Sequence, residues 1–150
     1  MLKGIDNRLN ADVLGCLRAM GHGDVLIIAD TNFPADSVAR ATVTGHLLRM
    51  ENLTAAEAAQ AVLSVLPLDT FVDDFAGRME IVGDPTTVPP VQAEVQAEIV
   101  LHHGIGVFGR EMIVIALAGP SLPPRQAGRV VAAVTAVRLA ALDAATVGRA

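Results

Sequence analysis

The sequence predicts a single α/β domain in which helices flank a central, mainly parallel β-sheet. Two continuous apolar runs, 25–29 and 112–118, are typical of strands that are buried on both faces. Segments with helix signals alternate with strand-like runs over the first 120 residues, which favours a layered α/β arrangement. A length of 150 residues is that of one domain, and it allows a core that needs no disulfide or metal.

The first forty residues are expected to hold a helix, a strand and a second, short helix. Asn10 is a suitable N-cap for a helix over 11–20, and Gly21 is placed to end that helix as a C′ glycine. The apolar run 25–29 then predicts a strand. Pro34 favours the start of the short helix, because its fixed φ suits the first turn.

The middle of the chain continues the alternation of strands and helices. A short strand is expected over 41–44. Thr54 and Glu57 have the spacing of a capping box, which predicts a helix over 54–66. The remaining expected elements are a strand over 79–82, a helix over 90–103 and a strand over 112–118.

The end of the chain differs in composition from the rest. Residues 120–124 are rich in proline and are expected to form a loop, and 126–150 consist almost entirely of Ala, Val, Arg, Leu, Gly and Thr. Propensity favours helix in this segment, which has neither a clean polar face nor a clear strand pattern. We therefore expect one domain over 1–150 with an atypical tail over 120–150.

Composition argues against nucleic-acid and membrane partners. The net charge is −5, the 11 Lys and Arg residues are scattered, and Trp and Tyr are absent. A nucleic-acid-binding protein would normally have a basic stripe or stacking aromatic residues. No run of about 20 apolar residues is present that could span a membrane. The high hydrophobic fraction of 52% favours surfaces that are covered in a homo-oligomer.

Cysteine content and the N-terminal sequence favour a cytoplasmic protein. Cys16 is the only cysteine, so an intrachain disulfide and a cysteine-based zinc cluster are excluded. The first residues lack the apolar core of a signal peptide.

The segment 21–24 (Gly-His-Gly-Asp) and the strand that ends at Asp30 are the best candidates for chemistry. His22 lies between two glycines, and an imidazole with an ordinary pKa near 6.5 can give or take a proton at neutral pH. Asp30 follows the buried strand, where open α/β sheets tend to bind ligands. A strand of five or six residues is roughly 17–20 Å long. The two residues can therefore share a site only if the loop folds back or a neighbouring subunit supplies one of them.

Structural roles remain open for the same residues. A histidine between two glycines can be a turn residue, and Asp24 can be a turn carboxylate. Asp30 with Asn32 can form an Asx-turn. His102 and His103 lie where a helix ends, and cationic side chains there complement the helix dipole. The chain has no metal-binding histidine motif, calcium loop, dinucleotide-binding motif or nucleophile elbow.

Four segments, taken in order, resemble the L-fucose mutarotase and D-ribose pyranase (RbsD/FucU) family. They are 2–5 (Leu-Lys-Gly-Ile), 19–24 (Ala-Met-Gly-His-Gly-Asp), 28–34 (Ile-Ala-Asp-Thr-Asn-Phe-Pro) and 66–71 (Leu-Pro-Leu-Asp-Thr-Phe). The Phe-Pro and Leu-Asp-Thr-Phe sequences favour the fucose mutarotase branch. The resemblance is good to about residue 85, looser to 118 and lost beyond.

This resemblance implies a cofactor-free, metal-free aldose mutarotase that interconverts the anomers of L-fucose or a related monosaccharide. It also implies ring-forming homo-oligomers with sites between subunits. The acid/base histidine of the family falls on His22 and its sugar-binding aspartate on Asp30. A further basic, substrate-binding residue falls on His102, with His103 and Arg110 as alternatives.

The tail departs from the family pattern. The family has a Tyr-Gly-Asn or Tyr-Ala-Asn segment after the late strand, followed by a final strand. This chain has Leu-Pro-Pro-Arg at 122–125 and contains no Tyr. The chain is either a divergent member with a remodelled pocket or one whose C-terminal reading frame has shifted. The alternative function is a non-catalytic sugar-binding or assembly protein on the same scaffold.

Overall fold

A computed structural model describes residues 2–21, 24–68 and 75–102 in full and three further strands by their backbone. The helices are α1 (Ala11–Ala19), α2 (Ala35–Ala39), α3 (Ala55–Leu63) and α4 (Pro90–His102). The strands are β1 (Val25–Ala29), β2 (Leu48–Met50), β3 (Ala76–Ile81), β4 (Met112–Ala116), β5 (Val130–Ala136) and β6 (Ala145–Val147). The predicted α/β class is confirmed.

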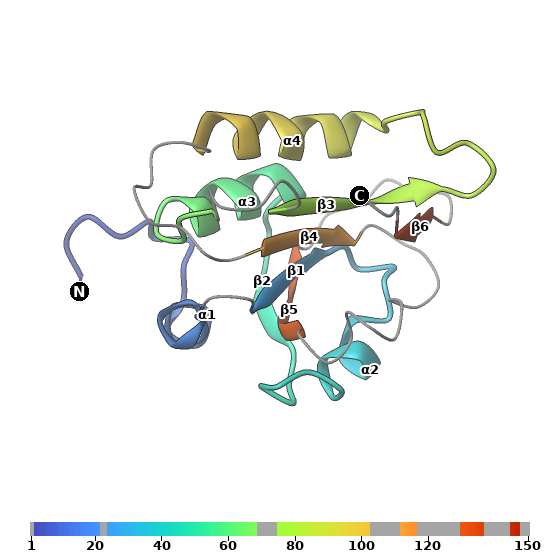
Figure 1. Cartoon of the computed structure of the whole chain (residues 1–150). Helices are drawn as coiled ribbons and strands as arrows, with labels where there is room; N and C mark the ends of the chain where they lie inside the picture. Colours follow the sequence, from blue (N-terminus) through green and yellow to red (C-terminus); the bar gives the residue numbers. More distant parts are fainter. Residues whose placement is uncertain are drawn as a thin grey trace.

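The strands form one sheet in the order β2-β5-β1-β4-β3-β6 (Figure 1). β1 lies between β4 and β5 and is parallel to both. β2 pairs with β5 and β3 pairs with β4, again in parallel, whereas β6 is antiparallel to β3. The first strand of the chain, β1, is therefore an inner strand. Its two ends lie at opposite ends of the sheet, measured along the strand direction.

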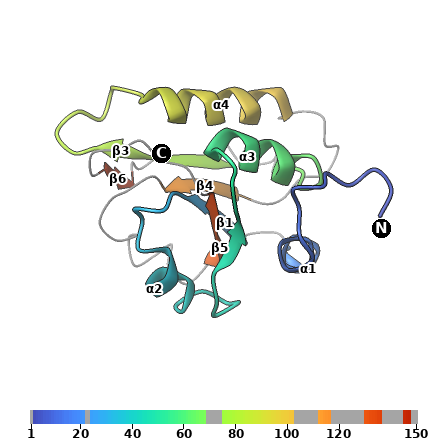
Figure 2. The same ribbon diagram turned by 180° about the vertical axis from the view of Figure 1, so that it is seen from behind.

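Helices cover both faces of this sheet (Figures 1 and 2). Leu26 and Ile28 of β1 pack in a core with buried residues of α1, α3 and α4. Val25, Ile27 and Ala29 pack on the other face, in a smaller core that includes Ala35 of α2. Every residue of β1 is buried, as the continuous apolar run predicts. Polar groups can therefore meet a ligand only beyond the ends of this strand.

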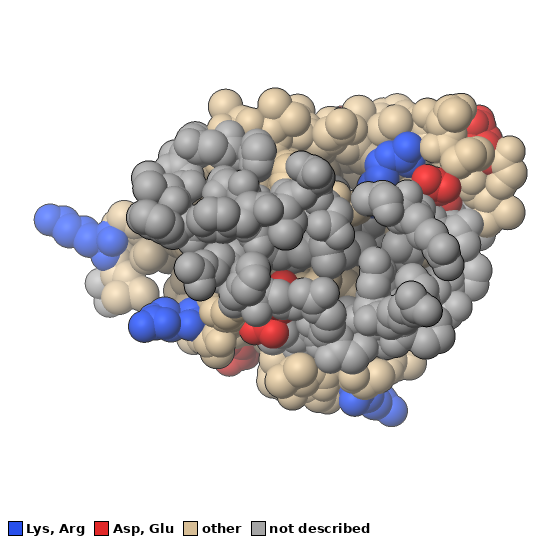
Figure 3. Space-filling model, viewed as in Figure 1, with Lys and Arg blue, Asp and Glu red and all other residues tan. Residues whose placement is uncertain are grey.

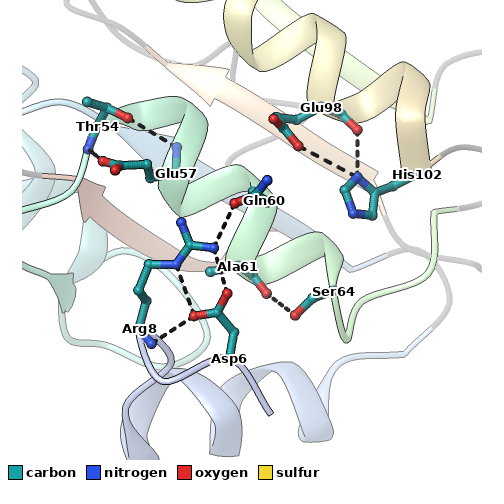
Figure 4. A network of polar contacts seen from close by, with 9 residues as sticks. All are labelled: Asp6, Arg8, Thr54, Glu57, Gln60, Ala61, Ser64, Glu98 and His102. Atoms are coloured by element: carbon teal, nitrogen blue, oxygen red, sulfur yellow. Dashed lines mark hydrogen bonds and ion pairs between the residues drawn. The ribbon is translucent and has the colours of Figure 1, made fainter. Parts of the chain in front are cut away.

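Two helices begin at the predicted caps. The Asn10 side chain accepts a hydrogen bond of 3.0 Å from the backbone N–H of Val13. The Thr54 hydroxyl accepts from the Glu57 N–H, and the Glu57 carboxylate accepts from the Thr54 N–H, which completes the capping box (Figure 4). These side chains supply partners for N–H groups that a helix leaves unpaired at its first turn.

The strand predicted over 41–44 is wrong. Thr42 donates its hydroxyl to the Ala39 carbonyl at the end of α2, and Gly45 has a φ of 69°. Both features fold this segment into turns. The edge strand comes later, at Leu48–Met50, where buried and exposed side chains alternate.

The helix favoured in the tail is also wrong, because the described parts of this segment are the strands β5 and β6. β5 lies between β1 and β2, and its Ala132, Ala133, Val134 and Thr135 pair with residues 26–29. A strand with a parallel neighbour on each side need not alternate polar and apolar residues. Tertiary pairing therefore overrides the helix propensity of the alanines.

Candidate active site

Asp30 lies directly after β1, at the end of the sheet where the parallel strands finish. Its Oδ1 accepts hydrogen bonds of 2.8 Å from the backbone N–H groups of Asn32 and Phe33. The predicted Asx-turn is therefore present, and it directs the chain from β1 towards α2. One oxygen of the carboxylate thus has a structural role.

The other oxygen of Asp30 has no such partner. The residue is 1% exposed, and Oδ2 is buried without a hydrogen bond among the described residues. Burial raises the pKa of this carboxyl, and the two backbone hydrogen bonds oppose the rise. A buried polar atom without a partner is costly, so its presence at the end of a central strand marks a place where a ligand could supply the missing donor.

A hollow of about 390 Å³ lies at the same end of the sheet. It extends from the turn after β1 to the edge strand β2. Its described lining includes Thr31, Pro34, Ser37, Leu47 and Arg49. A space of this size is within the usual range for small-molecule sites.

His22 lies outside the described residues, but the residues on either side of the pair 22–23 are described. The Asp24 N–H donates to the Gly21 carbonyl at 3.0 Å, and the Gly21 N–H donates to Asp24 Oδ2 at 2.8 Å. Asp24 is therefore the turn carboxylate that the sequence allowed. Met20, the C-cap of α1, has an extended conformation, and Gly21 does not have a positive φ. Gly21 therefore follows the helix at the expected C′ position but without the left-handed conformation usual there, and the Asp24 side chain accepts a hydrogen bond from its N–H.

His102 is the last residue of α4, and its side chain is 20% exposed. Its Nδ1 lies 2.8 Å from the carbonyl oxygen of Glu98 and 4.0 Å from Glu98 Oε2 (Figure 4). Donation from Nδ1 to the carbonyl leaves Nε2 as the nitrogen that can meet a ligand. His103 and Arg110, the alternatives to His102, lie outside the described residues.

Arg8 attaches the N-terminal segment to α3 (Figure 4). Its guanidinium donates to Asp6 at 2.9 and 2.6 Å and to Gln60 of α3 at 2.8 Å. The hydrogen bonds from Arg8 lower the pKa of Asp6. These hydrogen bonds join the N-terminal segment to α3.

Of the candidate residues that the structure describes, Asp30 and His102 of one protomer do not lie in a single cluster. Asp30 follows the last residue of β1, whereas Gly21 and Asp24 precede the first. The five residues between them span roughly 17 Å in an extended strand. The end of α4 lies on the side where β1 begins (Figures 1 and 2). His102 therefore shares an edge of the fold with the residues that flank His22, and Asp30 lies at the opposite edge.

Sequence reasoning missed Arg49. This residue lies in the edge strand β2 and lines the hollow near Asp30, although the sequence predicted no strand there. The alternation of Leu48, Arg49 and Met50 was the available signal, but three residues are too few to establish a period.

The described surface has no concentrated positive charge on the face that Figure 3 presents. Lys and Arg side chains are dispersed there among other residues. Within the described ranges, no group of three or more His, Cys, Asp or Glu side chains could hold a metal ion. No helix in that part of the chain is long and apolar enough to cross a membrane.

The chain is similar to the proteins of one known family. The sequence pattern of the RbsD / FucU transport protein family matches residues 3–135. The fucose mutarotase of Homo sapiens is 42% identical over 82 residues, which are 54% of this chain and 51% of the human protein. The match thus spans about half the length of that relative. The family pattern continues past residue 118, where the resemblance in the motifs ends.

Two solved structures extend the similarity over most of the chain. The crystal structure of protein Atu2016 matches with a TM-score of 0.73 and 44% identity, over 91% of this chain and 87% of that one. The fucose mutarotase of Streptococcus pneumoniae, solved in complex with L-fucose, matches with a TM-score of 0.62 and 25% identity. That match covers 91% of this chain and 88% of the other.

Proposed function

Because this chain belongs to the RbsD / FucU transport protein family, we propose that it is an aldose mutarotase acting on L-fucose or a related monosaccharide. The observation that carries the proposal is the buried Asp30 carboxylate, whose Oδ2 lacks a partner among the described residues. A sugar hydroxyl is a neutral donor that can satisfy this oxygen. The fucose mutarotases among the relatives make L-fucose the first candidate.

The reaction needs only proton transfers. A base takes the proton of the anomeric hydroxyl while an acid protonates the ring oxygen. The bond between C1 and the ring oxygen breaks, and its electron pair stays on that oxygen. The electron pair of the former O–H bond becomes the second bond of the aldehyde. Rotation about the C1–C2 bond and the reverse transfers give the other anomer, so the atoms and electrons balance without a cofactor.

His22 is the proposed acid and base. A neutral imidazole can exchange protons near pH 7, and general acid–base catalysis is worth about 10²–10⁴-fold. The hydrogen bonds between Gly21 and Asp24 support this role, because they join the two ends of the loop that carries His22. Asp30 is the proposed acceptor for a sugar hydroxyl, and His102 is a proposed third sugar-binding side chain.

The proposed site is completed between subunits of a homo-oligomer. This is supported by the length of β1, which separates Asp30 from the flanks of His22 by more than one small sugar can bridge. A ring in which the beginning of β1 in one subunit faces the end of β1 in the next would bring both residues to the same substrate. Exposed Val100 and Leu101 on α4 are consistent with surfaces that such an assembly covers.

The proposed cellular setting is the cytoplasm. Cys16 is a free thiol buried in α1, and burial raises its pKa. A buried, protonated thiol is unreactive and suits a reducing compartment.

A second candidate function is monosaccharide binding without catalysis. It is favoured by the absence of Tyr from the sequence, and with it of the Tyr-Gly-Asn segment. The scaffold and Asp30 could then bind a sugar whose ring does not open.

Magnetisation-transfer NMR on L-fucose and D-ribose separates the two functions. Saturation of one anomer's signal should pass to the other faster with protein than in buffer. Faster exchange with one sugar supports the mutarotase. Binding detected by calorimetry, without faster exchange for any aldose, would replace it with the binding function.

A further inference from the structure

Arg49 is held in place by its backbone while its side chain is exposed. Leu48 and Met50, on either side, are 2% and 1% exposed, and both belong to the larger core. The Asn10 side chain donates to the Arg49 carbonyl oxygen at 2.7 Å. Arg49 lines the hollow that begins at the turn after Asp30, and its side chain lies on the opposite face of the strand from that core. The backbone of Arg49 is therefore held in place, while its exposed side chain can contact a ligand.

The register of the sheet sets Arg49 level with the end of β1. Arg49 pairs with Thr135 of β5, and Thr135 pairs with Ala29. The backbones of Arg49 and Ala29 are thus two strand spacings apart, about 9.6 Å. Asp30 and Thr31 follow Ala29 directly, and Thr31 lines the same hollow as Arg49. A molecule of the size of a monosaccharide can bridge this separation.

The chemistry of the two side chains is complementary. A guanidinium carries five N–H donors and no acceptor, whereas an ionised carboxylate only accepts. Arg49 has no hydrogen bond or ion pair from its side chain within the described ranges. Arg40, which follows α2 beside the hollow, is paired with Asp36. A sugar hydroxyl can donate to Asp30 while another accepts from Arg49.

We propose that Arg49 is a substrate-binding residue that holds the sugar hydroxyls in the hollow beside the turn that begins at Asp30. This inference rests on the proposed sugar-binding function and adds a residue that determines affinity. An arginine on an edge strand can also serve only to discourage pairing with other chains. The two roles differ in their effect on sugar affinity.

The test compares Arg49→Gln with Arg18→Gln. Arg18 is also exposed, but it lies on α1 and lines a separate hollow. Anomer exchange by NMR gives kcat and KM for L-fucose, and calorimetry gives Kd. A hydrogen bond to a charged group is worth about 10- to 100-fold in affinity. We expect Arg49→Gln to raise KM and Kd by this factor with kcat changed less than threefold, and Arg18→Gln to match the wild type.

L-fucose analogues that each lack one hydroxyl sharpen the test. If Arg49 contacts one hydroxyl, the loss of affinity in Arg49→Gln should disappear for the analogue that lacks it. Arg49→Lys should recover part of the affinity, because it keeps a charged donor. An equal loss for every analogue, or none for any, would overturn the contact.

The outcomes separate this inference from the proposed function. Normal exchange in the wild type with an unchanged KM in Arg49→Gln overturns the inference and leaves the mutarotase intact. Sugar binding without exchange, weakened by Arg49→Gln, supports the inference and removes the mutarotase. A folded wild type that neither binds nor exchanges any aldose overturns both.

Discussion

The two ends of β1 differ in almost every physical respect. At its beginning, the described residues Gly21 and Asp24 lie in an accessible turn that closes on itself with two hydrogen bonds. At its end, Asp30 is 1% exposed, its pKa is raised by burial, and Oδ2 lacks a partner in the described part of the chain. The first end is satisfied and open to solvent, whereas the second is buried and unsatisfied.

This difference suggests separate tasks for the two ends. A proton-transferring group must be reached by substrate and exchange protons with water, which an open turn permits. A group that orients a substrate benefits from a dry setting, where a hydrogen bond is stronger. The strand between them is buried on both faces and fixes the two ends relative to each other.

Replacement of the open end should have the largest effect on activity. His22→Ala removes the proposed acid and base, so anomer exchange should fall by about 10²–10⁴-fold. His46→Ala is the matched control, because His46 is exposed and, among the described residues, its ring bonds only to the Thr44 carbonyl. Magnetisation-transfer NMR gives both rates. Equal rates in the two variants would remove His22 from the mechanism.

Replacement of Asp30, at the buried end of β1, should have the next largest effect on activity. Asp30→Asn keeps an oxygen that can accept from Asn32 and Phe33 but loses the charge, so kcat/KM should fall about 10- to 100-fold. The fold should persist, as circular dichroism would verify. Asp30→Ala should lose the turn as well as the activity. Full activity in Asp30→Asn would mean that the carboxylate serves only the turn.

The raised pKa of Asp30 predicts a pH dependence of stability with a definite sign. The native carboxyl holds its proton to a higher pH than the unfolded one, whose pKa is about 3.9. The wild type should therefore lose stability relative to Asp30→Asn as the pH rises from about 4 through the raised native pKa. Above that value, the difference should stay constant. Urea denaturation at several pH values measures it, and a difference that is flat throughout would contradict the raised pKa.

Loosening the turn at the open end should have a smaller effect. Asp24→Ala removes the acceptor for the Gly21 N–H. The loss of one hydrogen bond costs about 0.5–1.5 kcal/mol, which corresponds to a fall of up to about tenfold in exchange rate. Asp24→Asn keeps an acceptor oxygen and should restore most of the rate. Asp84→Ala is the control, because Asp84 accepts similar hydrogen bonds from Thr86 and Thr87 in a distant loop. An equal loss of rate in the control would assign the effect to general destabilisation.

The smallest effect on activity is expected far from both ends. Thr54→Ala breaks the capping box of α3 and should lower the free energy of unfolding by about 1 kcal/mol. Exchange by the folded protein should not change. A loss of exchange without a loss of stability would connect α3 to the site.

Local sequence signals predicted the elements around β1 well. The run 25–29, the Asn10 cap and the capping box at Thr54 depend on neighbours within a few residues, and each is present as predicted. The Asx-turn at Asp30 was among the open alternatives for the same reason. Such features can be recognised in one sequence because their partners lie close along the chain.

Two features that the sequence did not predict, the strand β5 and the place of Arg49, depend on distant pairing. β5 consists largely of alanine and valine and becomes a strand because β1 and β2 lie on either side of it. Arg49 enters the candidate site through a register that runs from β2 across β5 to β1. No periodicity in the sequence records this register, and the proposed pairing of His22 with Asp30 of a neighbouring subunit would be equally non-local.

Subunit mixing tests the central claim most directly, because it asks whether the two ends of β1 from different chains form one site. His22→Ala and Asp30→Asn proteins would be refolded together in equal amounts, and exchange would be measured by NMR once mixed oligomers have formed. Sites shared between neighbouring subunits should recover about a quarter of the wild-type rate, because a random pair holds both intact residues in about one case in four. Mixed oligomers no more active than the separate variants would contradict a shared site.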